Sequence, residues 1–263
     1  MAGNKGQGIV LQERDRRLLS ELGVMRVIDR ELAKRIAGFR STTRANARLL
    51  TLTRAGYLRR FFMGTEAGGT QALYTLSREG ERLTGAAFPG LRRKEDEVLV
   101  ADFYVSHQLS VNRVHCALKH EPIPVPDCQF LRFVSFREPI ASGASLIPDG
   151  YAEVSEGTKL LAMFLEIDLA SESLPVWKKK VSEYLRYAVS GISQTQWGLA
   201  QFRVLVVANT EERMNPLRRA TASLTDKIFW FTSLESIRAS GFWGPIWFRP
   251  KGDGPQALLG SRP

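Results

Sequence analysis

Apolar residues recur every three to four positions along the first fifty residues, which predicts a series of helices. A first helix is expected from Gln12 to about Leu22, and a second begins after Asp29. Gly38 interrupts the pattern after the second helix. The third helix begins after Ser41 and continues to Leu52. Aspartate and serine are favoured residues for capping a helix N-terminus. The spacing therefore predicts a helix-turn-helix with a short turn.

After the third helix the pattern changes to an alternation typical of strands. Gly56 predicts the helix end, and strands follow over Tyr57–Met63 and Thr70–Ser77, joined by a turn over Gly64–Gly69. Three helices and a β-hairpin predict a winged helix. The pattern LxxLxxxGYL, then the hairpin and a Ser-Arg-Glu-Gly helix start, resembles bacterial winged-helix DNA binders.

That resemblance implies that the third helix enters the major groove of DNA while the hairpin lies against the neighbouring backbone. The residues expected at base edges are Thr43, Arg44, Asn46 and Ala47. The residues expected at phosphates are Ser41, Thr42, Arg48, Arg59 and Arg60. A winged helix can also serve protein contacts, but arginines along the helix and hairpin favour double-stranded DNA.

The distribution of charge strengthens this interpretation. The chain has 263 residues and a formal net charge of +10. Residues 1–95 contain 19 Lys+Arg and 9 Asp+Glu, whereas residues 96–263 contain 18 of each kind. All of the excess positive charge therefore belongs to the first third, which indicates a nucleic-acid-binding part joined to a part with another task. The alternative is a basic surface that serves solubility.

The second part is expected to begin at a Pro/Gly-containing basic boundary over Pro89–Lys94. A long helix is predicted over residues 95–119. The further elements are strands at 129–136, 146–154, 159–169, 202–208 and 228–232, and helices at 174–189 and 216–223. We therefore predict an α+β protein: a winged helix-turn-helix domain at 1–88 and a mixed-sheet domain with an αβββαβ core at 89–250. A Gly/Pro-rich tail at 251–263 is expected to be disordered.

Three carboxylates interrupt the apolar strands of this core. Asp149 follows Ile147-Pro148, and Glu166 and Asp168 stand two residues apart, on one face of a strand. Buried carboxylates repel one another unless a cation joins them. Mg²⁺ or Mn²⁺ is suited to oxygen ligands, and Lys180 on the next helix is the other candidate. Structural roles, with Asp149 in a turn and Asp168 capping a loop, remain the alternative.

These residues resemble the PD-(D/E)xK nuclease motif, and the αβββαβ order resembles the restriction-endonuclease-like fold. The resemblance implies a catalytic set of Asp149, Glu166, Asp168 and Lys180, with the three carboxylates as metal ligands. Asp168 stands where that motif has its lysine, and Lys180 is expected to replace it. The departure puts cleavage in doubt, so Mg²⁺ or Mn²⁺ is expected only if the nuclease-like site is intact.

The order of motifs narrows the resemblance further. A winged helix, then IPDG, FLEIDLASES and the spacing of Lys180 and Tyr184 resemble the replication-relaxation family of bacterial mobile elements over residues 14–232. The resemblance to that family implies a role in plasmid replication, relaxation of plasmid DNA or conjugative mobilisation. We therefore expect a duplex DNA-binding accessory protein at an origin of transfer or replication, acting beside a relaxase or replication protein in the relaxosome.

Two other functions stay open. The first is a metal-dependent DNA-nicking endonuclease, and the second is a transcription regulator whose second domain dimerises or senses a signal. The aromatic segment Phe229–Phe231 fits either a homodimer contact or a core. With only Cys116 and Cys128, no long apolar run and no apolar signal-peptide core, we expect a cytoplasmic protein without membrane contact.

Overall fold

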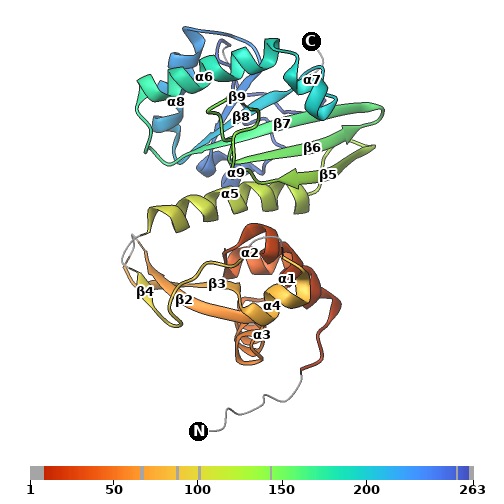
Figure 1. The fold of residues 1–263 in the computed structure, drawn as a ribbon, viewed down its shortest axis with the longest axis vertical. Coiled ribbons are helices and arrows are strands. Elements are labelled where there is room, and N and C mark those ends of the chain that lie inside the picture. Colours follow the sequence, from red (N-terminus) through yellow and green to blue (C-terminus); the bar gives the residue numbers. More distant parts are fainter. Residues whose placement is uncertain are drawn as a thin grey trace. The chain divides into compact units, whose positions relative to one another are not determined.

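A computed structural model shows an α+β protein that divides into two compact units, Met1–Cys116 and Ala117–Pro263 (Figure 1). The described residues are 9–65, 68–86, 89–99, 102–142, 144–252 and 254–260. Residues 66 and 67 of the predicted turn, and residues 253 and 261–263 of the predicted tail, lie outside them.

The division falls inside helix α5 (Phe103–His120), beyond the predicted boundary at residue 88. Asn112 explains why the first unit extends so far. Its side-chain amide donates hydrogen bonds to the carbonyls of Met25 and Val27, at 2.9 and 2.6 Å. Because such buried backbone acceptors require partners, the first part of α5 belongs to the first unit.

The helices and strands predicted for the first unit are confirmed. They are α1 (Glu13–Met25), α2 (Arg30–Ala37), α3 (Thr42–Arg54), β2 (Leu58–Gly64), β3 (Thr70–Leu76) and α4 (Arg78–Thr84). Asp29 and Ser41 cap α2 and α3 as expected, since their side chains accept hydrogen bonds from the backbone N–H groups of Leu32 and Arg44.

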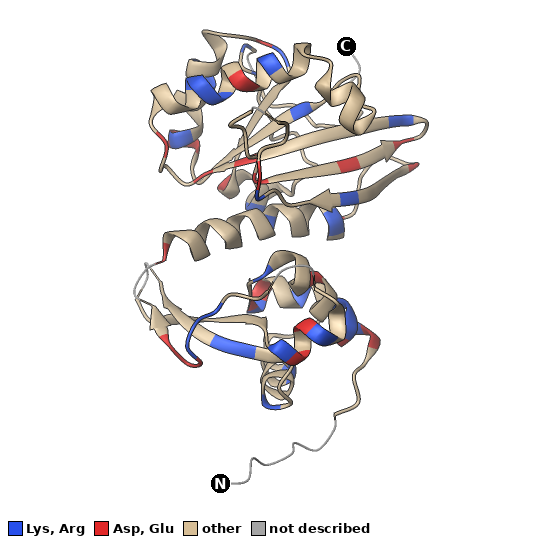
Figure 2. Ribbon diagram, viewed as in Figure 1, with Lys and Arg blue, Asp and Glu red and all other residues tan. Residues whose placement is uncertain are grey.

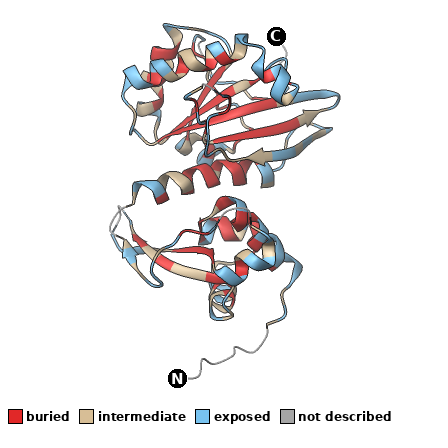
Figure 3. Cartoon of the chain, in the orientation of Figure 1, coloured by how far each residue is buried: buried red, intermediate tan, exposed pale blue. Residues whose placement is uncertain are grey.

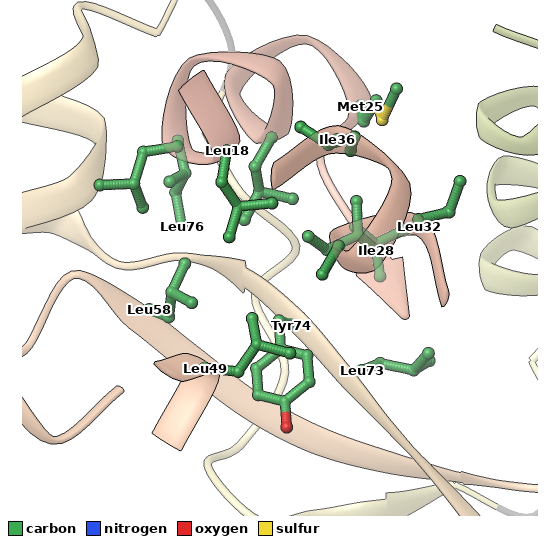
Figure 4. Packing of buried hydrophobic residues seen from close by; sticks show 14 of the residues in the cluster. Leu18, Met25, Ile28, Leu32, Ile36, Leu49, Leu58, Leu73, Tyr74 and Leu76 are labelled. Atoms are coloured by element: carbon green, nitrogen blue, oxygen red, sulfur yellow. The ribbon is translucent and has the colours of Figure 1, made fainter. Parts of the chain in front are cut away.

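Two short strands complete a mixed sheet in this unit. The strand order is β1-β3-β2-β4, with β1 (Ile28–Asp29) and β4 (Val98–Leu99) at its edges. β1 and β2 pair antiparallel with β3, and β4 pairs parallel with β2. Buried side chains from the helices and the hairpin, including Leu18, Ile36 and Leu49, form the core (Figure 4). This apolar burial holds the helices against the sheet.

The helix predicted from residue 95 begins eight residues later, at Phe103. Residues 95–99 instead form a turn and β4, because Asp96 adopts a positive φ of 55° that a helix does not allow. Asp102 then provides the helix start, as its carboxylate accepts a hydrogen bond from the Val105 N–H at 3.1 Å. Phe103, the first residue of the helix, is 56% exposed.

The second unit contains a five-stranded mixed sheet in the order β5-β6-β7-β8-β9. The strands are β5 (Cys128–Val134), β6 (Gly150–Glu156), β7 (Lys159–Asp168), β8 (Arg203–Ala208) and β9 (Phe229–Ser233). The helices that follow α5 are α6 (Leu174–Val189), α7 (Ile192–Trp197), α8 (Glu211–Ala222) and α9 (Leu234–Ser240). β5, β6 and β7 pair antiparallel, whereas β7, β8 and β9 run parallel. The predicted strands and α6 are confirmed, except that β6 begins four residues later than the strand predicted at 146–154. Helix α8 begins five residues earlier than predicted, and the sequence pattern missed α7 and α9.

Buried residues follow the central strands of this second unit (Figure 3), and its core is a cluster of apolar side chains. Trp177 and Val181 of α6 pack in one cluster with Phe164 of β7 and Phe229 of β9. The segment Phe229–Phe231 belongs to the core, because each of its residues is at most 5% exposed.

The predicted disorder of residues 251–263 does not extend to the segment around Leu258. Gln256 pairs with Trp247 in a β-bridge, and Leu258 and Leu259 are buried. This apolar burial keeps the segment on the second unit. Among the described residues, no helix is long and apolar enough to cross a membrane.

Candidate DNA-contacting face and carboxylate cluster

Helix α3 has one buried face and one exposed face. Ala45, Leu49 and Leu52 are fully buried. The residues predicted at base edges are all exposed: Thr43, Arg44, Asn46 and Ala47. The helical period that places the first group in the core turns the second group outward. Ser41 and Thr42 stand half-buried at the start of the helix, where the Ser41 hydroxyl caps the backbone.

Arg48, predicted at a phosphate, instead holds α3 against α1. Its Nε donates to the Asp15 carboxylate at 2.9 Å, and its Nη2 donates to that carboxylate and to the Val10 carbonyl. Asp15 is fully buried and also accepts the Gln12 N–H at 2.7 Å. The hydrogen bond from Arg48 to Asp15 raises the pKa of the guanidinium. The sequence pattern missed the role of Asp15, because a local pattern does not reveal a partner that lies 33 residues away in the chain.

The two arginines predicted on the hairpin, Arg59 and Arg60, contact the segment that leads into β4. Arg59 donates to the Arg93 carbonyl. Arg60 forms an ion pair with Asp96, with Nη2 at 2.7 Å and Nε at 2.9 Å from Oδ1. The Arg60 side chain is 30% exposed and that of Asp96 is 55% exposed. Both arginines are therefore half-buried and have partners within the first unit.

A hollow of about 290 Å³ lies beside the exposed face of α3. Its lining joins α2, α3 and the hairpin, and consists of Arg30, Glu31, Asn46, Thr65, Thr70, Gln71 and Ala72. Gln71 is fixed there by a 2.8 Å hydrogen bond from its amide to Asp29. Asn46 of α3 and the hairpin therefore face a common polar depression.

The backbone brings Asp149 next to Glu166 in the second unit. Asp149 directly precedes β6, and its N–H donates to the carbonyl of Leu165 in β7 at 3.0 Å. Its carboxylate accepts the Ile167 N–H at 2.7 Å. A Cβ on Gly150 would meet the Phe133 ring at 2.5 Å, so this position requires glycine. The sequence Asp-Gly thereby fixes the carboxylate at the start of β6.

Glu166 is buried, and both of its oxygens are paired. Lys180 of α6 donates to one oxygen at 2.9 Å, and the Tyr184 hydroxyl donates to the other at 2.6 Å. Burial raises the pKa of Glu166 to about 7; Lys180 opposes this rise, and the neighbouring Asp149 charge adds to it. The structure thus brings together Asp149, Glu166 and Lys180, as the sequence predicted.

Lys180 has a second carboxylate partner that the sequence pattern missed. Its ammonium group donates to Glu172 at 2.7 Å. Burial alone would lower the pKa of Lys180, but the two carboxylates raise it above its ordinary value. The ammonium therefore stays charged and offsets part of the negative charge of Asp149, Glu166 and Glu172.

Asp168 pairs with Arg213, whereas Glu166 and Glu172 pair with Lys180. Arg213 of α8 binds it through two parallel hydrogen bonds, at 2.7 and 2.8 Å, and the Ala170 N–H donates at 2.7 Å. Asp168 pairs with Ala208 across the parallel strands β7 and β8, so the helix that follows β8 begins beside it. That parallel pairing is the signal that could have identified Arg213.

The three carboxylates all have partners within the chain in this arrangement. Among the described residues, no group of three or more His, Cys, Asp or Glu side chains is placed to hold a metal ion. Glu166 is held by Lys180 and Tyr184, and Asp168 is held by Arg213 in a bidentate pair. Mg²⁺ requires several oxygen ligands around one point. Here Lys180 and Arg213 pair with Glu166 and Asp168, and Asp149 accepts the Ile167 N–H.

These features define an α+β protein with an exposed helical face in one unit and an internally hydrogen-bonded carboxylate cluster in the other. The chain belongs to the replication-relaxation family, whose model matches residues 14–201. Among curated proteins, none matches it significantly. The structure of the restriction endonuclease FokI is similar at 12% sequence identity, covering 86% of this chain and 43% of that one, with a TM-score of 0.29. The chain thus spans less than half of the FokI structure.

Proposed function

We propose that the first unit is a winged helix that binds duplex DNA, with α3 in the major groove. The observation that carries this proposal is the exposed set Thr43, Arg44, Asn46 and Ala47 on one face of a capped helix, followed by a hairpin. In helix-turn-helix proteins the first residues of the second helix reach the base edges. Arginine and asparagine are the side chains that pair most specifically with guanine and adenine.

The charge of this unit supports the same proposal. Lys and Arg exceed Asp and Glu by ten over residues 1–95, and Figure 2 marks the charged residues along the ribbon. Arg30, Arg40, Arg44 and Arg54 are all exposed. Positive charge on a nucleic-acid-binding unit supplies the sequence-independent part of affinity and makes it depend on salt.

We propose that the second unit is a restriction-endonuclease-like domain that does not cleave DNA. The order α5-β5-β6-β7-α6-β8 supports this fold, and the pairing of Glu166 with Lys180 and of Asp168 with Arg213 supports the absence of cleavage. With its family membership, this makes the protein an accessory factor at an origin of transfer or replication. A relaxase or replication protein is its proposed partner, and a homodimer is its proposed state.

Fluorescence anisotropy with a labelled 30-base-pair duplex tests DNA binding. Arg44→Ala should weaken binding at least about tenfold, because it removes a groove contact. Arg54→Ala is the matched control, since it removes the same charge from an exposed position at the other end of α3. Equal losses for the two variants would indicate nonspecific attraction and would contradict docking through the start of α3.

A metal-dependent nicking endonuclease is the second candidate, because Lys180 reaches Glu166 beside Asp149. Titration calorimetry with Mn²⁺ separates the two functions. A nuclease should bind Mn²⁺ saturably, and Asp149→Ala should abolish that binding. The proposed accessory protein should give no saturable heat, since Lys180 and Arg213 already pair with Glu166 and Asp168.

A further inference from the structure

An acidic segment runs along the β2 edge of the hairpin that is proposed to contact DNA. We call residues 93–99 the strap. The Asp96 N–H donates to the Arg60 carbonyl at 2.9 Å, and the Phe62 N–H donates to the Glu97 carbonyl at 2.8 Å. Val98 and Leu99 continue as β4, parallel to β2. The strap therefore covers backbone groups that an edge strand would otherwise expose.

The strap also places a carboxylate on an arginine predicted to bind DNA. A turn closed by hydrogen bonds between Lys94 and Glu97 presents Asp96 at a φ of 55°. The Asp96 carboxylate then receives two donors of Arg60, at 2.7 and 2.9 Å. Guanidinium groups bind phosphate oxygens with the same geometry as carboxylate oxygens. Asp96 therefore occupies the position that a DNA phosphate oxygen would take.

The ion pair between Arg60 and Asp96 can be replaced by one between Arg60 and a phosphate. Asp96 is 55% exposed, and exposed ion pairs contribute little to stability. β4 has only two residues, and Val98 is 59% exposed. Arg60 also packs over the Phe62 ring, with its Cζ 5.0 Å from the ring centroid, and this contact keeps the guanidinium on the outer face of β2. A phosphodiester can therefore displace Asp96 without disturbing the core of the unit.

We propose that Arg60 is a phosphodiester-binding site on the hairpin and that Asp96 of the strap occupies it until DNA binds. The inference rests on the proposed binding of duplex DNA and adds a regulated contact to it. The strap thus lowers affinity for nonspecific DNA, because each binding event must first separate Asp96 from Arg60.

Asp96→Asn tests the proposal, because asparagine tolerates the positive φ and removes only the charge. Anisotropy titrations should show affinity for a nonspecific duplex rising about three- to tenfold. The slope of log affinity against log salt should steepen by about one, which corresponds to one additional neutralised phosphate. Glu79→Gln is the matched control: it is 53% exposed and paired with Arg82 on α4. It should change affinity less than twofold.

A double-mutant cycle separates the strap from a general charge effect. In the Arg60→Ala background, Asp96→Asn should no longer change affinity, because no guanidinium remains to be released. Equal effects of Asp96→Asn with and without Arg60, or equal effects of Asp96→Asn and Glu79→Gln, would overturn the proposal.

The outcomes also separate this proposal from the binding it rests on. If wild-type binding depends on Arg44 while Asp96→Asn has no effect, DNA binding stands and the strap only covers the sheet edge. If neither wild type nor Asp96→Asn binds DNA, both proposals are wrong. Binding that appears only in Asp96→Asn and is lost with Arg60→Ala supports both.

Discussion

The candidate polar residues are exposed on α3 in the first unit and buried in the second. In the first unit, Arg44 and Asn46 are exposed on α3. In the second, Glu166 and Asp168 face inward, where Lys180 and Arg213 pair with them. The same kind of sequence signal, a charged residue beside apolar ones, therefore marks an exposed helical face in one place and an internal hydrogen-bonded network in the other. The presence of a partner on a neighbouring element decides between them.

The contrast also exists within one helix. Arg44 and Arg48 stand one turn apart on α3, yet Arg44 is exposed whereas Arg48 is bound to the buried Asp15 of α1. Substituting one residue of such a pair at a time separates the charges that stabilise the fold from those that are proposed to contact DNA.

The largest effect is expected for Arg48→Met, which keeps the aliphatic stem and removes the guanidinium. It leaves Asp15 buried without its cation, and breaking a buried ion pair from one side costs about 3–5 kcal/mol. Urea denaturation should show this loss in the free energy of unfolding. DNA affinity measured where the variant is folded should change less than about threefold, unlike that of Arg44→Ala. A large loss of affinity at unchanged stability would make Arg48 a DNA contact after all.

A smaller loss, about 2 kcal/mol, is expected for Lys180→Met at pH 7. Glu166 and Glu172 both lose their shared cation, but Glu166 can take up a proton and so limit the cost. Thermal or urea unfolding measures the loss. Lys179→Met, at an exposed neighbouring position, is the control and should be nearly neutral. Equal stability of the two variants would show that Lys180 does not neutralise the cluster.

The pH dependence of stability tests the burial of Glu166. Its folded pKa of about 7 lies above the ordinary 4.5, so the protonated form is favoured by folding. Its contribution is complete below about pH 4.5 and is lost as the pH rises through 7. Relative to Glu166→Gln, the wild type should lose about 3 kcal/mol of unfolding free energy across this interval. Parallel pH profiles for the two proteins would show that Glu166 keeps an ordinary pKa.

The smallest effect on stability is expected for Arg44→Ala. Its side chain is exposed, and exposed substitutions away from caps and buried networks change stability by about 0.5 kcal/mol or less. Circular dichroism melting should therefore superimpose on that of the wild type even though DNA affinity falls. A clearly lower melting temperature would mean that the loss of affinity reflects unfolding.

The sequence pattern predicts local elements well and partners between elements poorly. The caps Asp29 and Ser41, the hairpin and α6 follow from periodicity and turn residues, because these signals are local. The approach of Lys180 to Glu166 could be predicted, since a helix directly after a strand packs back on its sheet. Arg213 could not, because its contact with Asp168 depends on which strand lies beside β7.

Asp15 and Asp96 escaped prediction for the same physical reason. Each lies in a segment that reads as an ordinary helix or linker, and each acquires its role from an arginine more than thirty residues away. The helix predicted from residue 95 also concealed the strap, because an acidic run followed by Val98 and Leu99 satisfies helical spacing as well as it satisfies a short edge strand.

One agarose gel of supercoiled plasmid tests the contrast between the two units most directly. Wild type incubated with plasmid and Mg²⁺ or Mn²⁺ should retard the DNA, and the plasmid should still be supercoiled once the protein is removed. Arg44→Ala should require at least about ten times more protein for the same retardation, and Glu166→Ala should retard the DNA as the wild type does wherever the variant is folded. Open circles that require the metal and disappear in Glu166→Ala, or equal retardation by Arg44→Ala and wild type, would contradict the account.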